Sequence, residues 1–226
     1  MAVMELDELS FRKVLPYLTP DVILVTNLYR DSFSRNANPD FIFNVMSHYV
    51  SPKTKLVLNA DDLISCRLTP QDASRVYYSI GRLADDTAEP QGIVCDLTAC
   101  PVCGGKLEYD YCHLRHLGHA TCKSCGFTNP EPDYELTALD REAHTFTVCE
   151  RSHEGAPTHT YRYGNYSITN LYNLFSTVVV ARELGLSAEA IGTSLERGIN
   201  VTALRYTEEE AGGKRLVAVA SKGENS

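Results

Sequence analysis

The residues whose type and spacing point most directly to chemistry are four cysteines arranged as two pairs. Two residues separate the members of each pair, eighteen residues lie between the pairs, and a glycine follows each pair. Such short turns aim two thiolates at one point, and the glycines let backbone amides face the sulfurs. The spacing predicts a zinc ribbon with one structural zinc ion and no open position for catalysis, its ligands being Cys100, Cys103, Cys122 and Cys125.

Other uses of these side chains stay open from the sequence alone. The same four cysteines suit two disulfides or buried free thiols. A second set of possible metal ligands lies inside the same segment and comprises Cys112, His113, His116 and His119. We expect the aromatic residues of this region to form the small core of the ribbon or, alternatively, a partner surface; they are Tyr109, Tyr111, Phe127 and Tyr134.

Composition narrows the class of protein. The 226 residues can hold one sizeable core plus a small module, and no apolar run approaches the roughly 18 residues that a membrane span needs. The acidic N-terminus lacks the basic and apolar blocks of a signal peptide. We therefore expect a cytoplasmic protein with reduced cysteines and no transmembrane segment. The net charge of -8 argues against nucleic acid as a partner.

The pattern before the cysteines predicts a parallel sheet. Residues 21–26 and 54–58 are short apolar runs rich in β-branched side chains, and a helical pattern at residues 39–50 lies between them. Residues 8–18 indicate a preceding helix and residues 74–80 a further strand. Continuous apolar strands joined by a helix are typical of parallel sheets covered on both faces.

The pattern after the cysteines changes to alternating strands and then to helices. Antiparallel strands are predicted at residues 134–139, 144–150 and 159–163. Two helices are predicted at residues 167–184 and from Ser187 to about Arg197, and a last strand at residues 214–220. The fold class is therefore α/β, with a mostly parallel central sheet flanked by helices. Its first part comprises residues 1–98, the inserted zinc ribbon residues 99–134, and its second part residues 135–226.

Polar segments follow the predicted parallel strands. Asn27 comes directly after the first strand, and Asn59 and Asp61 come after the second. Tyr166 and Asn170 lie in a third polar segment, residues 163–170, which leads into the long helix. The carboxyl ends of parallel strands are where α/β proteins place their ligands. Taken singly, each segment is explained equally well by turns and helix caps.

The order of these segments resembles the central domain of the Mur ligases, the ATP-dependent enzymes of peptidoglycan precursor synthesis. The strand ends TNLYRD and LNADD, the ribbon motifs CPVCGG and CKSCGF, and the sequence GNYSITN resemble its MurT branch in particular. The resemblance covers nearly the whole chain. It implies that Glu5 helps to hold magnesium, that Asn27, Asn59 and Asp61 border the nucleotide, and that Tyr166 and Asn170 face the adenine. Without the resemblance, Glu5 is most simply a solvated carboxylate near a helix start.

The resemblance also implies an activity. Ligase subunits of this branch use ATP and magnesium to activate the α-carboxylate of D-glutamate in lipid II. Ammonia from a GatD-like glutaminase subunit then displaces the phosphate and leaves D-isoglutamine.

Departures from the family pattern lead to a further expectation. The chain has no GxxxxGK[ST] loop for the ATP phosphates, Ser167 replaces an asparagine, and Ser32, Phe33 and Ser34 replace Gln-Leu-Asp. We expect the N-terminal phosphate loop and the C-terminal domain to be absent, so that the chain is the nucleotide-facing portion of the ligase and inactive alone. The alternative is a non-catalytic zinc-ribbon adaptor, or a degenerate ligase domain, that binds a partner.

Overall fold

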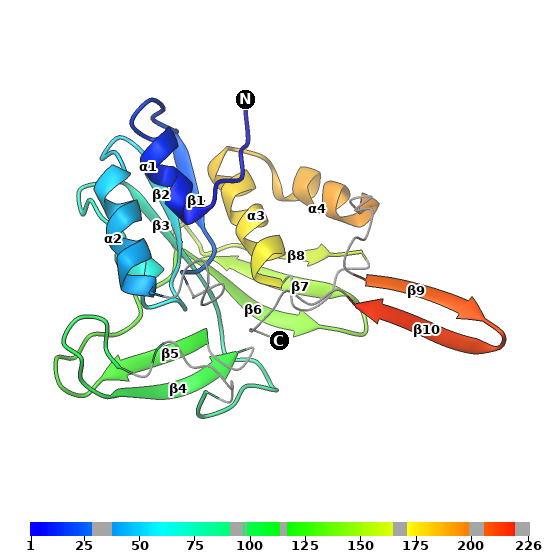
Figure 1. The fold of residues 1–226 in the computed structure, drawn as a ribbon. Coiled ribbons are helices and arrows are strands. Elements are labelled where there is room, and N and C mark those ends of the chain that lie inside the picture. Colours follow the sequence, from blue (N-terminus) through cyan, green and yellow to red (C-terminus); the bar gives the residue numbers. More distant parts are fainter. Residues whose placement is uncertain are drawn as a thin grey trace.

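A six-stranded sheet forms the centre of the protein (Figure 1). The computed structural model describes residues 1–28, 38–90, 97, 99–113, 117–164, 171–198 and 206–219. The strands of the sheet, in spatial order, are β1 (Val22–Val25), β2 (Lys55–Asn59), β3 (Arg75–Ile80), β6 (Tyr134–Asp140), β7 (Thr145–Glu150) and β8 (Thr158–Arg162). The first four are parallel, and β7 and β8 each run antiparallel to the preceding strand. The predicted α/β class and mostly parallel sheet are confirmed.

The β2 strand shows why the central strands are apolar throughout. Its residues Leu56, Val57 and Leu58 are all 0% exposed. Because side chains alternate along a strand, Leu56 and Leu58 join the core on one face, and Val57 joins the core on the other. Both faces of β2 are therefore covered, as its apolar sequence predicts.

Short helices cover the first face. They are the 3-10 turn η1 (Glu8–Ser10) and the helices α1 (Phe11–Val14) and α2 (Pro39–Tyr49), with a further 3-10 turn, η2 (Ser65–Arg67), after β2. Asn38 caps α2 by accepting a hydrogen bond from the Phe41 amide at 3.1 Å. The helix predicted at residues 8–18 is shorter than expected, because Pro16 has no amide to continue the hydrogen-bond pattern.

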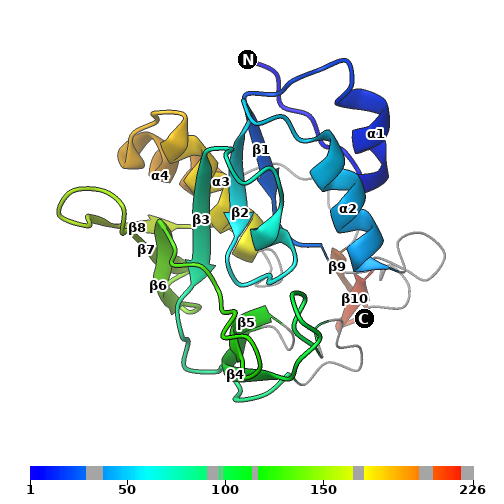
Figure 2. The same cartoon turned by 90° about the vertical axis from the view of Figure 1, so that its left-hand side faces the viewer.

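Two further helices, α3 (Leu171–Glu183) and α4 (Ala188–Arg197), cover the opposite face, as Figure 2 shows with the sheet between the helix pairs. Gly185 has a φ of 85° between them, and Ser187 caps α4 by accepting from the Ala190 amide at 3.2 Å. The predicted break and cap are confirmed. In the part of the chain that the structure describes, no helix is long and apolar enough to span a membrane.

Two hairpins complete the fold. The ribbon hairpin consists of β4 (Leu107–His113) and β5 (Leu117–Cys122) and lies beyond the carboxyl ends of the parallel strands (Figures 1 and 2). A separate hairpin consists of β9 (Tyr206–Ala211) and β10 (Lys214–Val219). The predicted C-terminal strand is therefore present, but its partner β9 was not predicted.

Tyr134 does not belong to the core of the ribbon, contrary to the sequence-based expectation. It is the first residue of β6, is 0% exposed within the second core, and donates a hydrogen bond to Glu183 at 2.7 Å. Glu183 also pairs with Lys55 at 2.8 Å. The expectation failed because the sequence around an aromatic residue at the boundary of the insert does not show whether its side chain packs in the ribbon or in the sheet.

A buried ion pair joins the antiparallel part of the sheet to α3. Glu150 is 1% exposed and accepts two hydrogen bonds from Arg182, at 2.5 and 3.0 Å. Burial by itself raises the pKa of Glu150, but the hydrogen bonds and charge of Arg182 outweigh it, so the pKa lies below the ordinary value. The ionised carboxylate is therefore part of the folded structure.

We expect Glu150→Gln to lower the free energy of unfolding by about 3 kcal/mol at neutral pH, because it leaves Arg182 without its charged partner. The folded-state pKa is lowered, so this stability is present above the unfolded pKa of about 4.3 and is lost as pH falls through the folded value. Urea unfolding of wild type and variant between neutral and acidic pH measures both effects. The exposed Glu154→Gln serves as control, and equal stability of Glu150→Gln and wild type at neutral pH would contradict the prediction.

Candidate functional site

The carboxyl ends of β1 and β2 are joined by the side chain of Asn59. Its amide nitrogen donates to the carbonyl of Thr26 at 2.8 Å, and its amide oxygen accepts from the Asp61 backbone at 2.9 Å. Asn59 is 0% exposed. The strand-end segments that contain Asn27 and Asn59 therefore lie side by side.

Asp61 connects this edge to two further elements. One carboxylate oxygen accepts from the Ser79 hydroxyl at 2.9 Å, and the other accepts from the Ile80 amide at 2.8 Å and from the Tyr172 hydroxyl at 2.9 Å. Ser79 and Ile80 end β3, whereas Tyr172 lies in the first turn of α3. The carboxylate thus holds the ends of β2 and β3 and the start of α3 together.

A second buried carboxylate follows directly. Asp62 accepts from the Leu28 amide at 2.7 Å and from the Ile64 amide at 2.9 Å. Burial raises the pKa of both Asp61 and Asp62, and hydrogen bonds at each carboxylate oppose that effect. Together the two aspartates tie backbone segments that are far apart in sequence into one polar edge.

The predicted site residues take different places. Asn59 and Asp61 are brought together and buried, whereas Asn27 is exposed two residues after the end of β1. Glu5 is exposed before η1 and makes no hydrogen bond to the Asn59 and Asp61 network among the described residues. Tyr166 and Asn170 lie outside the described residues.

The structure adds residues that were not predicted from the sequence. Tyr172 has the spacing of a helix core residue, and Ser79 lies within a strand, so neither carries a sequence signal of its role. Asp62 was visible beside Asp61, but a turn was sufficient to explain it. Their contacts join residues 18 to 111 positions apart, which no local pattern encodes.

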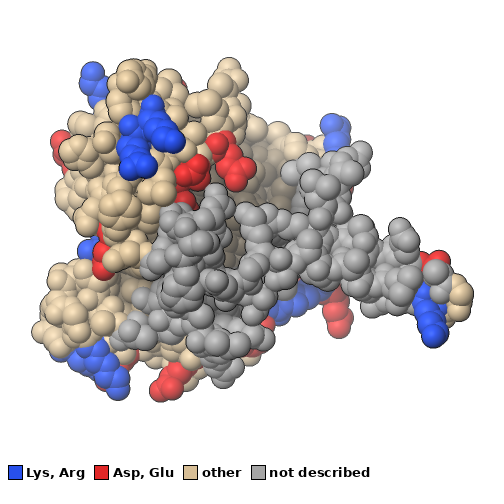
Figure 3. All heavy atoms as spheres, in the orientation of Figure 1, with Lys and Arg blue, Asp and Glu red and all other residues tan. Residues whose placement is uncertain are grey.

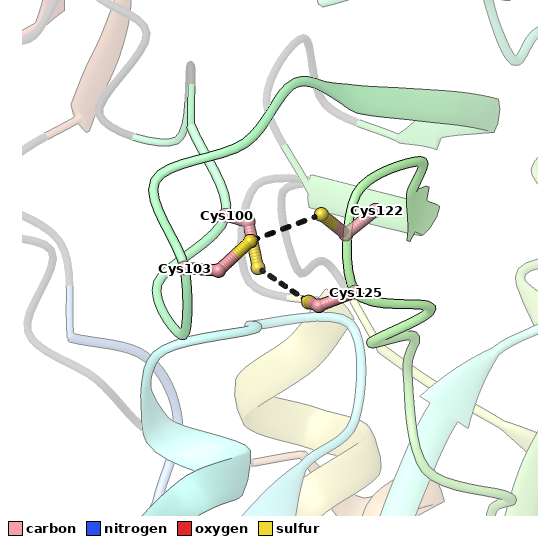
Figure 4. A group of neighbouring side chains, drawn as sticks. All are labelled: Cys100, Cys103, Cys122 and Cys125. Carbon is pink, nitrogen blue, oxygen red and sulfur yellow. Dashed lines mark hydrogen bonds between the residues drawn. The ribbon is translucent and has the colours of Figure 1, made fainter.

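The four cysteines of the ribbon converge on one point (Figure 4). Their sulfurs all lie within 4.8 Å of one another, with 3.7 Å between Cys100 and Cys125 and 3.5 Å between Cys103 and Cys122. A disulfide would require about 2.05 Å. Tetrahedral ligands at a zinc–sulfur distance of about 2.3 Å lie roughly 3.8 Å apart. The sulfurs therefore have the spacing of a metal site rather than of disulfides.

Two turns of the same geometry present these sulfurs. In the first knuckle, residues 100–105, the Cys100 amide donates to the Gly105 carbonyl at 2.7 Å; in the second, residues 122–127, the Cys122 amide donates to Phe127 at 2.8 Å. Gly104 and Gly126 both have a φ of 73°, a left-handed conformation that favours glycine. The glycines in the sequence motifs are therefore required by the turns.

The competing ligand set has other partners. His113 lies 2.6 Å from Asp86 and 2.8 Å from the Ile80 carbonyl, and His119 lies 2.6 Å from Asp110. Cys112 is buried in β4, and His116 lies outside the described residues. Among the residues that the structure describes, Cys100, Cys103, Cys122 and Cys125 form the one group of three or more cysteine, histidine or acidic side chains able to hold a metal ion.

We expect Tyr172→Phe to lower the free energy of unfolding by about 2 kcal/mol, because Asp61 loses a hydrogen bond to a buried charged group. Chemical denaturation at neutral pH measures the change. Tyr17→Phe, at a position that is 90% exposed, is the matched control. A stability of Tyr172→Phe equal to that of the control would show that this bond does not hold α3 to the strand ends.

The sequence of this chain was compared with those of known proteins, and it is similar to one kind of ligase subunit. No protein-family model matches the chain. The MurT subunit of lipid II isoglutaminyl synthase (glutamine-hydrolysing) from Staphylococcus aureus strain COL is 32% identical over 197 residues, which are 87% of this chain and 43% of that subunit. The chain thus spans less than half the length of this curated relative.

Solved structures agree with this relationship. A pseudomurein peptide ligase type C from Methanothermus fervidus superposes with a TM-score of 0.64 at 25% identity, covering 81% of this chain and 35% of the ligase. UDP-N-acetylmuramoyl-L-alanyl-D-glutamate–2,6-diaminopimelate ligase, at 12% identity, shares the fold with a TM-score of 0.57, covering 94% of this chain and 35% of that enzyme. The chain is therefore homologous to MurT over 87% of its length, and it has the fold of the ligases that these structures represent.

Proposed function

We propose that this chain is the central, nucleotide-facing portion of an ATP-dependent amide ligase of the MurT kind. The observation that carries the proposal is the homology to MurT over 87% of the chain. The hydrogen-bonded edge at the carboxyl ends of β1, β2 and β3 supports it, because this is where α/β proteins bind nucleotides. Since the match covers 43% of the relative, the activity is proposed for a protein that combines this segment with the remaining parts of such a subunit.

The reaction that we propose is amidation of D-glutamate in lipid II. The α-carboxylate oxygen attacks the γ-phosphorus of ATP, giving an acyl phosphate and ADP. Ammonia from a GatD-like glutaminase then attacks the acyl carbon, and phosphate leaves with the electrons of the broken C–O bond. The product is the D-isoglutamine form of lipid II. We place this work in the cytoplasm, where a four-thiolate site keeps its reduced cysteines.

The residue roles follow from position. Asn27 is exposed at the strand ends and is available to a nucleotide. Asn59 and Asp61 border the nucleotide site, and their hydrogen bonds hold the strand ends in place. Tyr166 and Asn170, which precede α3, are assigned to the adenine, and Glu5 to magnesium. Magnesium offsets charge on the transferring phosphate when bound.

The distribution of charge supports a small nucleotide rather than a nucleic acid as ligand. The chain has a net charge of -8. Figure 3 shows the described lysine and arginine side chains of one face in several separate groups, with acidic side chains among them. A phosphate backbone is held by a continuous cationic surface, which this face does not present in its described part.

The test of function uses this chain combined with the remaining parts of a MurT-like subunit, together with a GatD-like glutaminase, lipid II, glutamine and Mg-ATP. We expect mass spectrometry to detect conversion of the glutamate carboxylate to the amide. Glu5→Gln should slow this conversion roughly tenfold or more, because magnesium loses a ligand. The exposed Glu142→Gln is the control. Binding of the glutaminase without any amidation would favour the adaptor alternative instead.

The four-cysteine site is proposed to hold structural zinc within the insert predicted at residues 99–134, between portions at residues 1–98 and 135–226, although Tyr134 itself already begins β6. We expect Cys103→Ser to lower the zinc content well below one ion per chain and to destabilise the ribbon, because a tetrahedral site loses one ligand. Metal analysis by mass spectrometry measures the zinc. Cys149→Ser, outside the cluster, is the control, and an unchanged zinc content of Cys103→Ser would reject the assignment.

A further inference from the structure

The ribbon contacts the strand ends directly through two buried polar side chains. Asn129, which is 7% exposed, comes just after the second knuckle, and His113, which is 2% exposed, ends β4. Figures 1 and 2 both show β4 and β5 beyond the carboxyl ends of β2 and β3. Neither residue belongs to the four-cysteine metal site, and the proposed reaction does not use either of them. Their contacts therefore need a separate explanation.

Asn129 joins the ribbon to the segment between the two main site residues. Its amide nitrogen donates to the Ala60 carbonyl at 2.6 Å and to the Gly118 carbonyl at 2.9 Å, and its amide oxygen accepts from the Ala120 amide at 2.8 Å. Ala60 lies between Asn59 and Asp61, whereas Gly118 and Ala120 belong to β5. One side chain therefore spans from the ribbon to the edge of the sheet.

His113 holds the other side of the same edge. Its Nε2 atom lies 2.8 Å from the Ile80 carbonyl, which can only accept, so this nitrogen donates. Its Nδ1 atom lies 2.6 Å from the Asp86 carboxylate, and both side chains are buried. The amide of the same Ile80 donates to Asp61. The ribbon therefore positions the residue whose amide supports the Asp61 carboxylate.

The charge of His113 adds to this support. Burial raises the pKa of Asp61, and the nearby positive charge of His113 opposes that effect. The ribbon thus contributes both a hydrogen bond and a counter-charge to the buried network.

The metal site and Asn129 are connected through the second knuckle. Thr121 and Thr128 form a backbone bridge at its base, and the Thr128 hydroxyl donates to the Ala120 carbonyl at 3.0 Å. Asn129 is the next residue. A metal ion that holds the two knuckles together therefore also restricts where Asn129 can lie.

We propose that the ribbon is a positioning module for the nucleotide-facing edge, in which metal binding sets Asn129 and His113 and these two residues fix Ala60 and Ile80 around Asp61. The identity of the ligand rests on the function proposed above, whereas the positioning does not. Because coupling between two binding sites is reciprocal, metal and nucleotide should each favour the binding of the other.

The first test titrates the 226-residue chain with Mg-ATP by calorimetry and measures metal content in parallel. Asn129→Ala and His113→Leu should keep their metal and bind Mg-ATP about tenfold more weakly. His113→Gln should recover part of the affinity, since its amide can donate to the Ile80 carbonyl. His119→Gln, a ribbon histidine bound to Asp110, should match wild type. Unchanged affinity in folded Asn129→Ala and His113→Leu would overturn the proposal.

The second test does not need a nucleotide. Amide hydrogen exchange at Asp61 and Ile80 is measured before and after a chelator removes the metal from the wild-type chain. We expect faster exchange at both amides and unchanged protection at Val178 in α3. No change at Asp61 and Ile80 would overturn the proposal, and so would equal acceleration at Val178, which would mean general unfolding. This arm also decides the matter if a variant does not fold.

The two tests separate the two proposals. If wild type binds no Mg-ATP but exchange at Asp61 and Ile80 responds to metal removal, the edge does not bind the nucleotide without the remaining parts of a MurT-like subunit, and the positioning role stands. The proposed function is then decided by the amidation assay. If Mg-ATP binds but neither the variants nor metal removal has an effect, the function stands and the positioning role is wrong.

Discussion

The buried carboxylate of Asp61 is the interaction on which the arrangement of the strand ends depends. A carboxylate inside a protein is tolerated only where hydrogen-bond donors replace the lost water, and here the donors come from Ser79, Ile80 and Tyr172. Those donors belong to β3 and α3, so β2 keeps its acidic side chain only if both elements are in place. The requirement makes the polar edge cooperative, since each partner depends on the presence of the others. It also explains why such a costly group is compatible with a stable core.

The ribbon extends this dependence beyond the sheet. Its apolar residues Leu107 and Ala120 belong to the same core cluster as α1 and α2, so it is packed against the domain as well as hydrogen-bonded to it. Strand-end carbonyls at Ala60 and Ile80 receive their donors from the ribbon. An insert that supplies hydrogen bonds to its host is part of the construction of the site, whether or not its metal takes part in chemistry.

Much of the fold could be predicted from local patterns, and the reasons are physical. Strand β2 is apolar because both of its faces are covered, and the cysteine turns need a fixed ligand spacing with left-handed glycines. The proximity of the segments that contain Asn27 and Asn59 followed from their positions after parallel strands. These features depend on residues that are close in sequence or on the periodic spacing of apolar residues, and both can be seen in the sequence.

The remainder depends on contacts between distant residues. Asp86 stands in a polar stretch of the sequence, yet its side chain is buried against His113, 27 residues away. No residue near Asn129 in the sequence indicates its contact with Ala60. Tyr134 follows the ribbon in the sequence like the other aromatic residues of that region, but its side chain is buried in the core of the sheet. Glu5 stays a prediction, and so do Tyr166 and Asn170, which lie outside the described residues. The α3 helix shows a last consequence of such contacts, because Tyr172 secures its start to Asp61 and Glu183 secures its end to Lys55. Asp61 follows the carboxyl end of β2, and Lys55 lies at its amino end. The two contacts therefore hold a helix of about 20 Å at both of its ends, and the helix cannot slide along β2 or rotate without breaking one of them.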